Sequence, residues 1–104
     1  MSDSKLAKVS KIIDHVMMLA TKTSKKFSMG LEETKKANEF GAIDELVFSE
    51  KVIQDNDEQE VINFLNDVEA KGGKLYSVDG STDTGLRVSG LGGIISLLRF
   101  SIEG

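Results

Sequence analysis

Segments with helical periodicity alternate with short apolar segments along the chain, and this alternation is the feature that most limits its fold. In the first segment, apolar residues recur at steps of three and four, which places them on one face of a helix. Residues 42–49 instead form a compact apolar run, as expected of a buried strand. We predict helices within residues 2–22, 31–41 and 55–73, strands at 42–49, 74–78 and 94–102, a loop at 79–85, a short helix or turn at 86–93, and a short connection or brief strand at 27–30.

Strands that alternate with helices favour a parallel sheet, because each crossover helix covers a face of the sheet. The predicted fold class is therefore α/β, a three-layer α/β/α sandwich with a short, mostly parallel central sheet. With 104 residues the chain has the usual size of one domain, and we assign residues 1–104 to a single domain.

Composition excludes several classes of function. The chain has no cysteine, which rules out disulfides, thiolate metal sites and cysteine nucleophiles, and a reducing cytoplasm is the simplest compartment. No apolar run is long enough to span a membrane, so we expect no membrane partner. The net charge of −4 means that any RNA contact needs a local basic patch. Candidates for such a patch are Lys22, Lys25, Lys26, Lys35 and Lys36.

The tripeptide Asp83-Thr84-Gly85 is also the active-site signature of aspartic proteases. That chemistry requires two aspartates that share a proton in a dry site, usually after an apolar strand. Here the polar stretch "DGST" precedes the tripeptide, and helices dominate the chain. We therefore interpret residues 79–85 as a flexible acidic loop.

No other motif assembles a catalytic or metal-binding set. Gly90, Gly92 and Gly93 precede a strand, whereas a phosphate-binding loop leads into a helix. His15 has no second histidine or cysteine with which to bind a metal ion. The acidic residues between Asp55 and Glu60 are explained by a helix start, where negative charge is favourable. The sequence thus predicts no enzyme activity, no cofactor and no metal site.

Three long segments resemble one known family. These are "GLEETKKANEFGAIDELVFSE", "FLNDVEAKGGKLYSV" and "TGLRVSGLGGIISLLRF", which cover residues 30–50, 64–78 and 84–100. Together they resemble the C-terminal domain of the pelota family, relatives of class 1 release factors that rescue stalled ribosomes. The related release-factor domain commonly carries an inserted subdomain near the acidic helix, for which this chain has no room.

The resemblance implies a fold shared with kink-turn-binding ribosomal proteins. It also implies that the chain corresponds to the third domain of pelota, expressed from Met1, with the N-terminal and central domains absent. The expected function is non-catalytic docking to an elongation-factor-like GTPase and to a ribosome-recycling ABC ATPase on stalled ribosomes. Our candidate partner-binding residues are Lys22, Lys25, Lys26, Lys36 and Arg87.

The second hypothesis is a kink-turn RNA-binding module of the same fold. In that family an asparagine–glutamate pair and a following lysine contact the bent RNA, and the corresponding positions here are Glu32, Glu33 and Lys36. Glu32 replaces the amide and adds negative charge where phosphates would lie. Direct, specific RNA recognition therefore ranks below protein docking.

Overall fold

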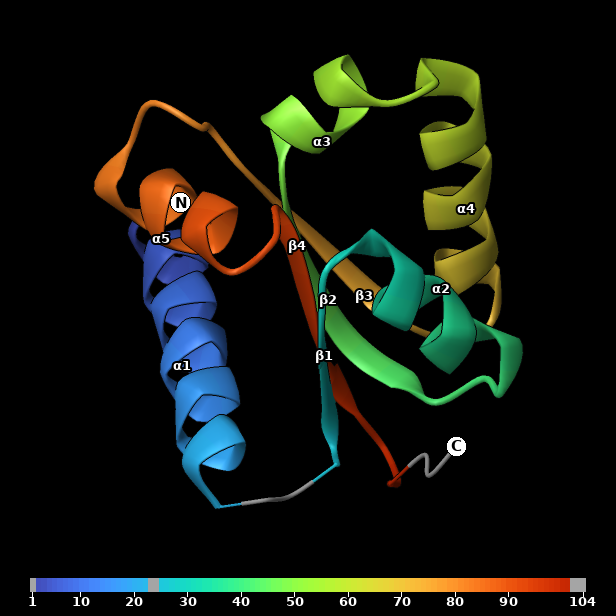
Figure 1. Ribbon diagram of the computed structural model, residues 1–104. Helices are drawn as coiled ribbons and strands as arrows, with labels where there is room; N and C mark the ends of the chain where they lie inside the picture. The colour runs from blue at the N-terminus through green and yellow to red at the C-terminus, as the bar shows by residue number, and fades with distance from the viewer. Residues whose placement is uncertain (1, 23–24, 102–104) are drawn as a thin grey trace.

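The computed structural model describes residues 2–22 and 25–101, with side chains described from residue 7 onward, and contains one mixed sheet between two layers of helices (Figure 1). Its elements are α1 (Ser2–Thr21), β1 (Phe27–Met29), α2 (Leu31–Glu39), β2 (Ile43–Ser49), α3 (Glu50–Asp55), α4 (Glu58–Ala70), β3 (Lys74–Val78), α5 (Asp83–Gly90) and β4 (Ile94–Leu98). The long helices and the strands agree with the predicted segments. The short helix α3 was not predicted, and residues 27–29 do form a strand.

The sheet has the strand order β1-β4-β2-β3 and is mostly antiparallel. Only β2 and β3 run parallel, whereas β4 is antiparallel to both of its neighbours. The prediction of a mostly parallel sheet is therefore wrong. The cause is the return from α5, where Gly93 accepts a hydrogen bond from the backbone N–H of Ser49, the last residue of β2. Since β4 starts where β2 ends, the two strands must run in opposite directions.

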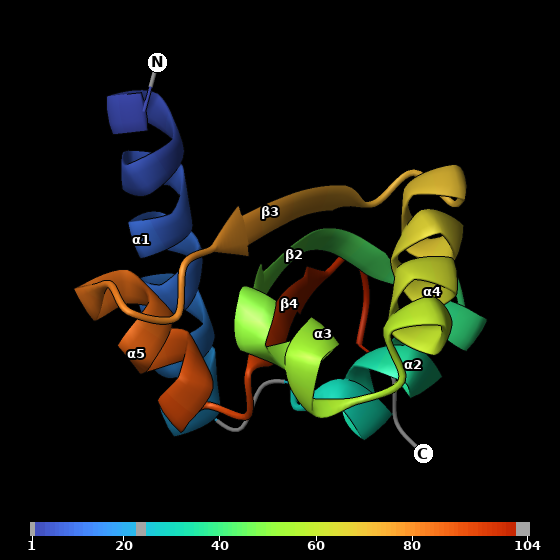
Figure 2. The ribbon, with the colours of Figure 1, turned by 90° about the horizontal axis from the view of Figure 1, so that it is seen from above.

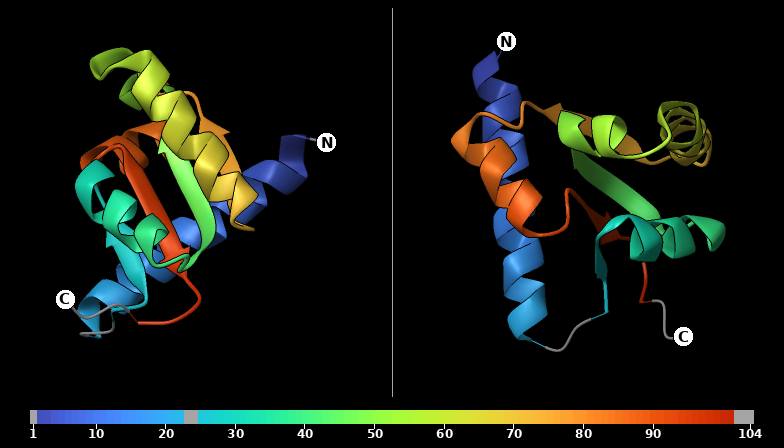
Figure 3. Two further views of the ribbon diagram at one scale, coloured as in Figure 1. Left: turned by 90° about the vertical axis from the view of Figure 1, so that its right-hand side faces the viewer. Right: turned by 45° about the horizontal axis from the view of Figure 1, so that its top comes forward.

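Helices cover both faces of the sheet, as predicted (Figure 2). Side chains of β4 alternate between the two faces, because successive residues of a strand point in opposite directions. Ile95 and Leu97 pack with α1 and α5, whereas Ile94 and Leu98 pack with α2, α3 and α4. The left view in Figure 3 shows α4 and α2 in front of the sheet and α1 behind it. Each face thus has its own apolar core.

A buried hydroxyl cluster lies where α2 meets the sheet. Ser28 of β1 is hydrogen-bonded to Thr34 of α2 at 2.8 Å and to Ser96 of β4. Thr34 also donates to the carbonyl of Gly30 at 2.7 Å. Because these buried hydroxyls are paired with one another, they cost little on folding and hold the start of α2 against two strands.

One ion pair and two hydrogen bonds connect the ends of α2 and α4. Lys71 pairs with Asp67 at 3.1 Å and donates to the carbonyl of Asn38, the second-last residue of α2, at 3.0 Å. The side-chain amide of Asn38 donates to Asp67 at 2.6 Å. Hydrogen bonds from Lys71 and Asn38 lower the pKa of Asp67 below its usual value.

Replacing Asp67 with Asn should lower the stability of the fold near pH 7 and have little effect in acid. A carboxylate whose pKa is lowered by folding stabilises the chain above its unfolded pKa, which is about 3.9 for aspartate. That contribution disappears as the pH falls through the folded-state value. Urea unfolding of both proteins across this pH range checks the prediction. The control Glu69→Gln, an exposed change on the same helix, should show no stability difference that disappears in acid. A pH-independent difference for Asp67→Asn would contradict the assignment.

Candidate functional site

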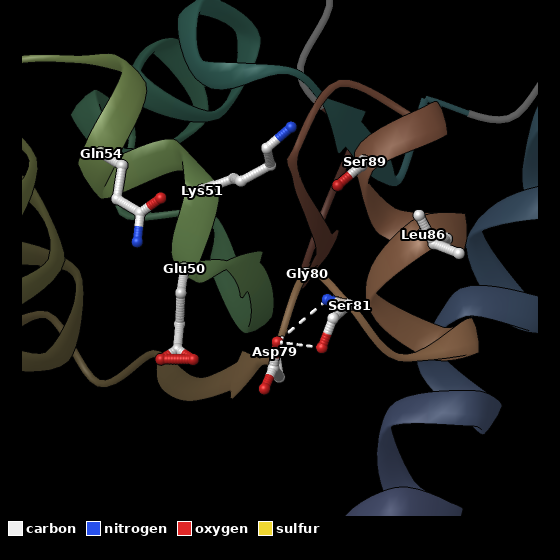
Figure 4. Close-up of a pocket in the computed structure, with 8 residues that line it drawn as sticks. All are labelled: Glu50, Lys51, Gln54, Asp79, Gly80, Ser81, Leu86 and Ser89. Carbon is white, nitrogen blue, oxygen red and sulfur yellow. Dashed lines mark hydrogen bonds between the residues drawn. The ribbon is translucent and has the colours of Figure 1, made fainter.

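A cleft of about 370 Å³ lies at the carboxyl ends of the parallel strands β2 and β3 (Figure 4). This is the edge of a sheet at which α/β folds commonly bind their ligands. The cleft is lined by Glu50, Lys51 and Gln54 of α3, by Asp79, Gly80 and Ser81 of the loop that follows β3, and by Leu86 and Ser89 of α5. Three separate segments therefore build one open surface.

Hydrogen bonds fix the loop that forms one wall of the cleft. The Asp79 carboxylate accepts from the backbone N–H and the hydroxyl of Ser81, at 2.9 and 2.8 Å. The Asp79 carbonyl accepts from the backbone N–H and hydroxyl of Thr82. Thr82 in turn caps α5 by accepting from the backbone N–H of Gly85 at 3.0 Å. The prediction of a loop therefore holds for residues 79–82 and is wrong for residues 83–85, which belong to α5.

The same contacts place the tripeptide Asp83-Thr84-Gly85 in the first turn of α5 rather than in a loop. Asp83 is exposed, and its negative charge there is favourable for the start of the helix. Gly85 is buried, and a methyl group at this position would overlap the carbonyl oxygen of Asp79. The glycine is required because the loop backbone passes directly against the helix.

The charges of the cleft suit binding better than bond-making. Hydrogen bonds from Ser81 lower the pKa of Asp79, so its carboxylate is ionised at neutral pH. The Glu50 carboxylate lies on the same side of the cleft as that of Asp79, whereas the Lys51 ammonium extends away from them (Figure 4). Among the described residues, no group of three histidine, cysteine, aspartate or glutamate side chains is placed to hold a metal ion.

The sequence-predicted partner residues lie in three separate places. Lys22 follows the end of α1 and Lys25 and Lys26 precede β1, so these three occupy one end of the α1 layer. Lys36 is exposed on α2, across the sheet from α1. Arg87 lies on α5, where its guanidinium pairs with Asp14 of α1 at 2.9 Å. Arg87 thus links two helices, and the five residues do not form one patch.

The positions weighed for kink-turn binding are accessible. Glu32, Glu33 and Lys36 are exposed on α2, and nothing in the structure tests whether they contact RNA. Two of the acidic residues between Asp55 and Glu60 have structural roles, since Asp57 caps α4 and Glu60, in its first turn, pairs with Lys35 at 3.0 Å. No helix in the described ranges is long and apolar enough to cross a membrane.

The cleft was not predicted from the sequence, although the sequence pattern of one of its walls was recognisable. In the segment "DGSTDTG", Asp79 precedes Ser81 by two positions and Thr82 precedes Gly85 by three. These spacings are typical of an aspartate turn followed by a helix cap. The other wall comes from α3, and only the three-dimensional pairing of β2 with β3 brings the two walls together.

The fold and the cleft define an α/β domain with an open surface between α3, the loop after β3 and α5, and with no metal-binding group of three side chains among its described residues. A family model described as eRF1 domain 3 matches residues 6–102. The chain is 69% identical over 103 residues to a protein pelota homolog of Nitrosopumilus maritimus, and the match covers 99% of this chain and 29% of that protein. The chain spans less than a third of this relative.

Solved structures of the same kind share the fold. The structure of S. cerevisiae Dom34, a translation termination-like factor involved in RNA quality control pathways and interacting with Hbs1, matches with a TM-score of 0.86 and 29% identity, over 97% of this chain and 29% of that one. An archaeal Pelota bound to the ribosome with ABCE1 matches with a TM-score of 0.85 and 21% identity, over 97% of this chain and 28% of that one. The chain belongs to the eRF1 domain 3 family, among the pelota homologues.

Gly85→Ala should destabilise the domain by about 2 kcal/mol or more, because the added methyl group displaces the Asp79 carbonyl from a packed, hydrogen-bonded wall. The matched control is Gly90→Ala at the other end of α5, where no atom lies within 4 Å of the added group. That variant should change the stability by less than about 1 kcal/mol. Urea denaturation measures both, and equal effects would show that the loop does not pack rigidly against α5.

Proposed function

We propose that this domain is a non-catalytic docking module of a pelota-type ribosome-rescue factor. Its partners would be a translational GTPase similar to Hbs1 and a recycling ATPase similar to ABCE1, engaged on stalled ribosomes. The observation that carries the proposal is family membership across residues 6–102, together with the partners named for the related solved structures. The inferred role concerns one domain of a larger relative, since the match covers 29% of the Nitrosopumilus protein.

A docking role agrees with the physical character of the surface. Affinity between proteins depends on anchors that are already held in their bound geometry, because less side-chain entropy is then lost on association. The Asp79–Gly85 wall supplies such a preformed element, and Leu86 next to it is 60% exposed. An exposed leucine beside fixed polar groups is suited to contact with another protein.

The lysines at the end of α1 offer a second contact of different character. Lys22, Lys25 and Lys26 bring three positive charges close together in a chain with a net charge of −4. Local positive charge on an acidic protein orients the approach of a negatively charged partner and raises the rate of association. We propose this end of the α1 layer as the GTPase- or ATPase-facing surface.

The kink-turn hypothesis remains a prediction without a supporting observation. The exposed acids Glu32 and Glu33 place two negative charges next to Lys36 on the same short helix. Such charges oppose the phosphate backbone on which most RNA affinity depends. Protein docking is therefore the function that we propose.

Reversing two of the α1-end lysines should weaken binding to the GTPase or the ATPase. We expect Lys22→Glu combined with Lys25→Glu to reduce affinity about tenfold, because two attractive contacts become repulsive. Titration of labelled domain with each purified partner, measured by fluorescence anisotropy at low and high salt, checks the prediction. Lys26 is kept because its side chain lines a separate groove.

The matched control carries Lys36→Glu and Lys74→Glu, which produce the same change in charge on α2 and β3. This control should bind nearly as tightly as the unmodified domain. A larger loss in the control would assign the contact to α2 or β3 rather than to the α1 end. No detectable binding of either partner by the unmodified domain would remove the docking function itself.

A further inference from the structure

A groove runs between α1 and the strands at the end of the sheet opposite the cleft. It consists of two adjoining hollows of about 200 and 180 Å³ that share His15, Glu45 and Leu97. The remaining lining residues are Lys8, Lys11, Ile12, Leu19, Lys26, Asp44 and Leu98. Ile12 and Leu97 are buried and supply an apolar floor, while the charged side chains lie around it.

The groove exists because the helical layer on this face is incomplete. α1 lies mainly over β4 and β1, and α5 covers β2 beside the upper half of α1 (Figure 1). In the alternation of β2, Glu45 shares a face with the buried Val47, so it occupies a position where a covered sheet carries an apolar side chain. Instead, Glu45 retains 17% exposure of its side chain and pairs with Lys8 at 3.4 Å. The start of β2 is therefore left open on this face.

Lysines outnumber carboxylates along the groove. Lys8, Lys11 and Lys26 line it, against Asp44 and Glu45. The Glu45 charge is already paired with Lys8. The side chains of Lys11 and His15 are exposed on α1 and have no hydrogen-bond or ion-pair partner among the residues that the structure describes. The local balance is opposite to the net charge of −4 of the whole chain.

We propose that this groove binds an extended acidic segment of a protein partner. The apolar floor at Ile12 and Leu97 receives an apolar side chain, and Lys11 and His15 contact flanking carboxylates. An extended peptide suits the shape, because a channel with an apolar floor and polar rims matches the alternating side chains of a strand-like segment. The inference depends only on the groove, which adjoins the α1-end lysines at Lys26.

An RNA strand suits the groove less well than an acidic peptide. RNA binding to single strands relies on aromatic side chains that stack on bases, and the lining contains no phenylalanine, tyrosine or tryptophan. The carboxylate of Asp44, at one end of the groove, repels a continuous row of phosphates, whereas a peptide can place its acids beside Lys11 and His15 alone. The two kinds of ligand are separated directly by experiment.

The test uses the 104-residue chain and a fluorescein-labelled heptapeptide, Glu-Asp-Leu-Glu-Leu-Asp-Glu, in an anisotropy titration. We expect saturable binding that weakens at higher salt. Lys11→Glu should reduce affinity about fivefold or more, since an exposed ion pair contributes up to about that factor and reversal adds repulsion. His15→Glu should also reduce affinity, because the new carboxylate repels the acidic peptide. Amide chemical-shift changes should cluster at Glu45 and Leu97. Both substitutions are at exposed positions, and unchanged urea midpoints confirm that the variants are folded.

Lys36→Glu, on the other side of the sheet, is the matched control and should leave peptide affinity unchanged. The proposal is overturned by absence of saturable binding at millimolar peptide, by equal loss in the Lys36 control, or by equal affinity for a peptide with lysine in place of each acid. It is also overturned if a ten-nucleotide uridine RNA binds in a Lys11-dependent manner and the acidic peptide does not. Because neither translation factor is present, the result is independent of the docking function proposed above.

Discussion

Burial of β4 on both of its faces is the constraint on which the rest of the structure depends. All five residues from Ile94 to Leu98 are buried, and the strand pairs with β1 on one side and β2 on the other. Each of its four isoleucine and leucine side chains contributes about 1.5–3 kcal/mol on burial, so together they rival the net stability of about 5–15 kcal/mol that a domain retains. Such a strand requires a layer of helices on each face.

The groove and the cleft both form where the helical layers stop covering the sheet. On the α1 side, α1 and α5 together cover the sheet but leave the first residues of β2 without a helix over them, which produces the groove. At the other end of β2, the chain enters α3 directly through the cap at Ser49, while β3 leads into the hydrogen-bonded wall before α5. The cleft lies between these two exits. Neither feature belongs to a single element, and both arise from the limits of packing helices on a short sheet.

The sequence was sufficient for the elements that depend on local pattern and insufficient for those that depend on strand order. Periodicity located α1, α2, α4 and β2, because burial imposes a repeat on the residues themselves. Periodicity did not give the direction of β4, since an apolar strand has the same residue pattern whether it pairs parallel or antiparallel. The hydrogen bond between Ser49 and Gly93 shows that β4 begins beside the end of β2. The helix α3 is too short to display a repeat. The five predicted partner residues could be chosen by charge, but their separation onto the segment between α1 and β1, onto α2 and onto α5 is a tertiary property.

The arrangement of the two hollows at opposite ends of β2 permits simultaneous contacts. Glu45 belongs to the groove and Glu50, immediately after the strand, belongs to the cleft. A strand advances about 3.3 Å per residue, so the two positions are separated by roughly 17 Å, which exceeds the Debye length of about 8 Å at physiological salt. A charged partner at one end therefore has little electrostatic effect on the other. The charges of the groove and of the cleft are therefore largely independent of each other at physiological salt.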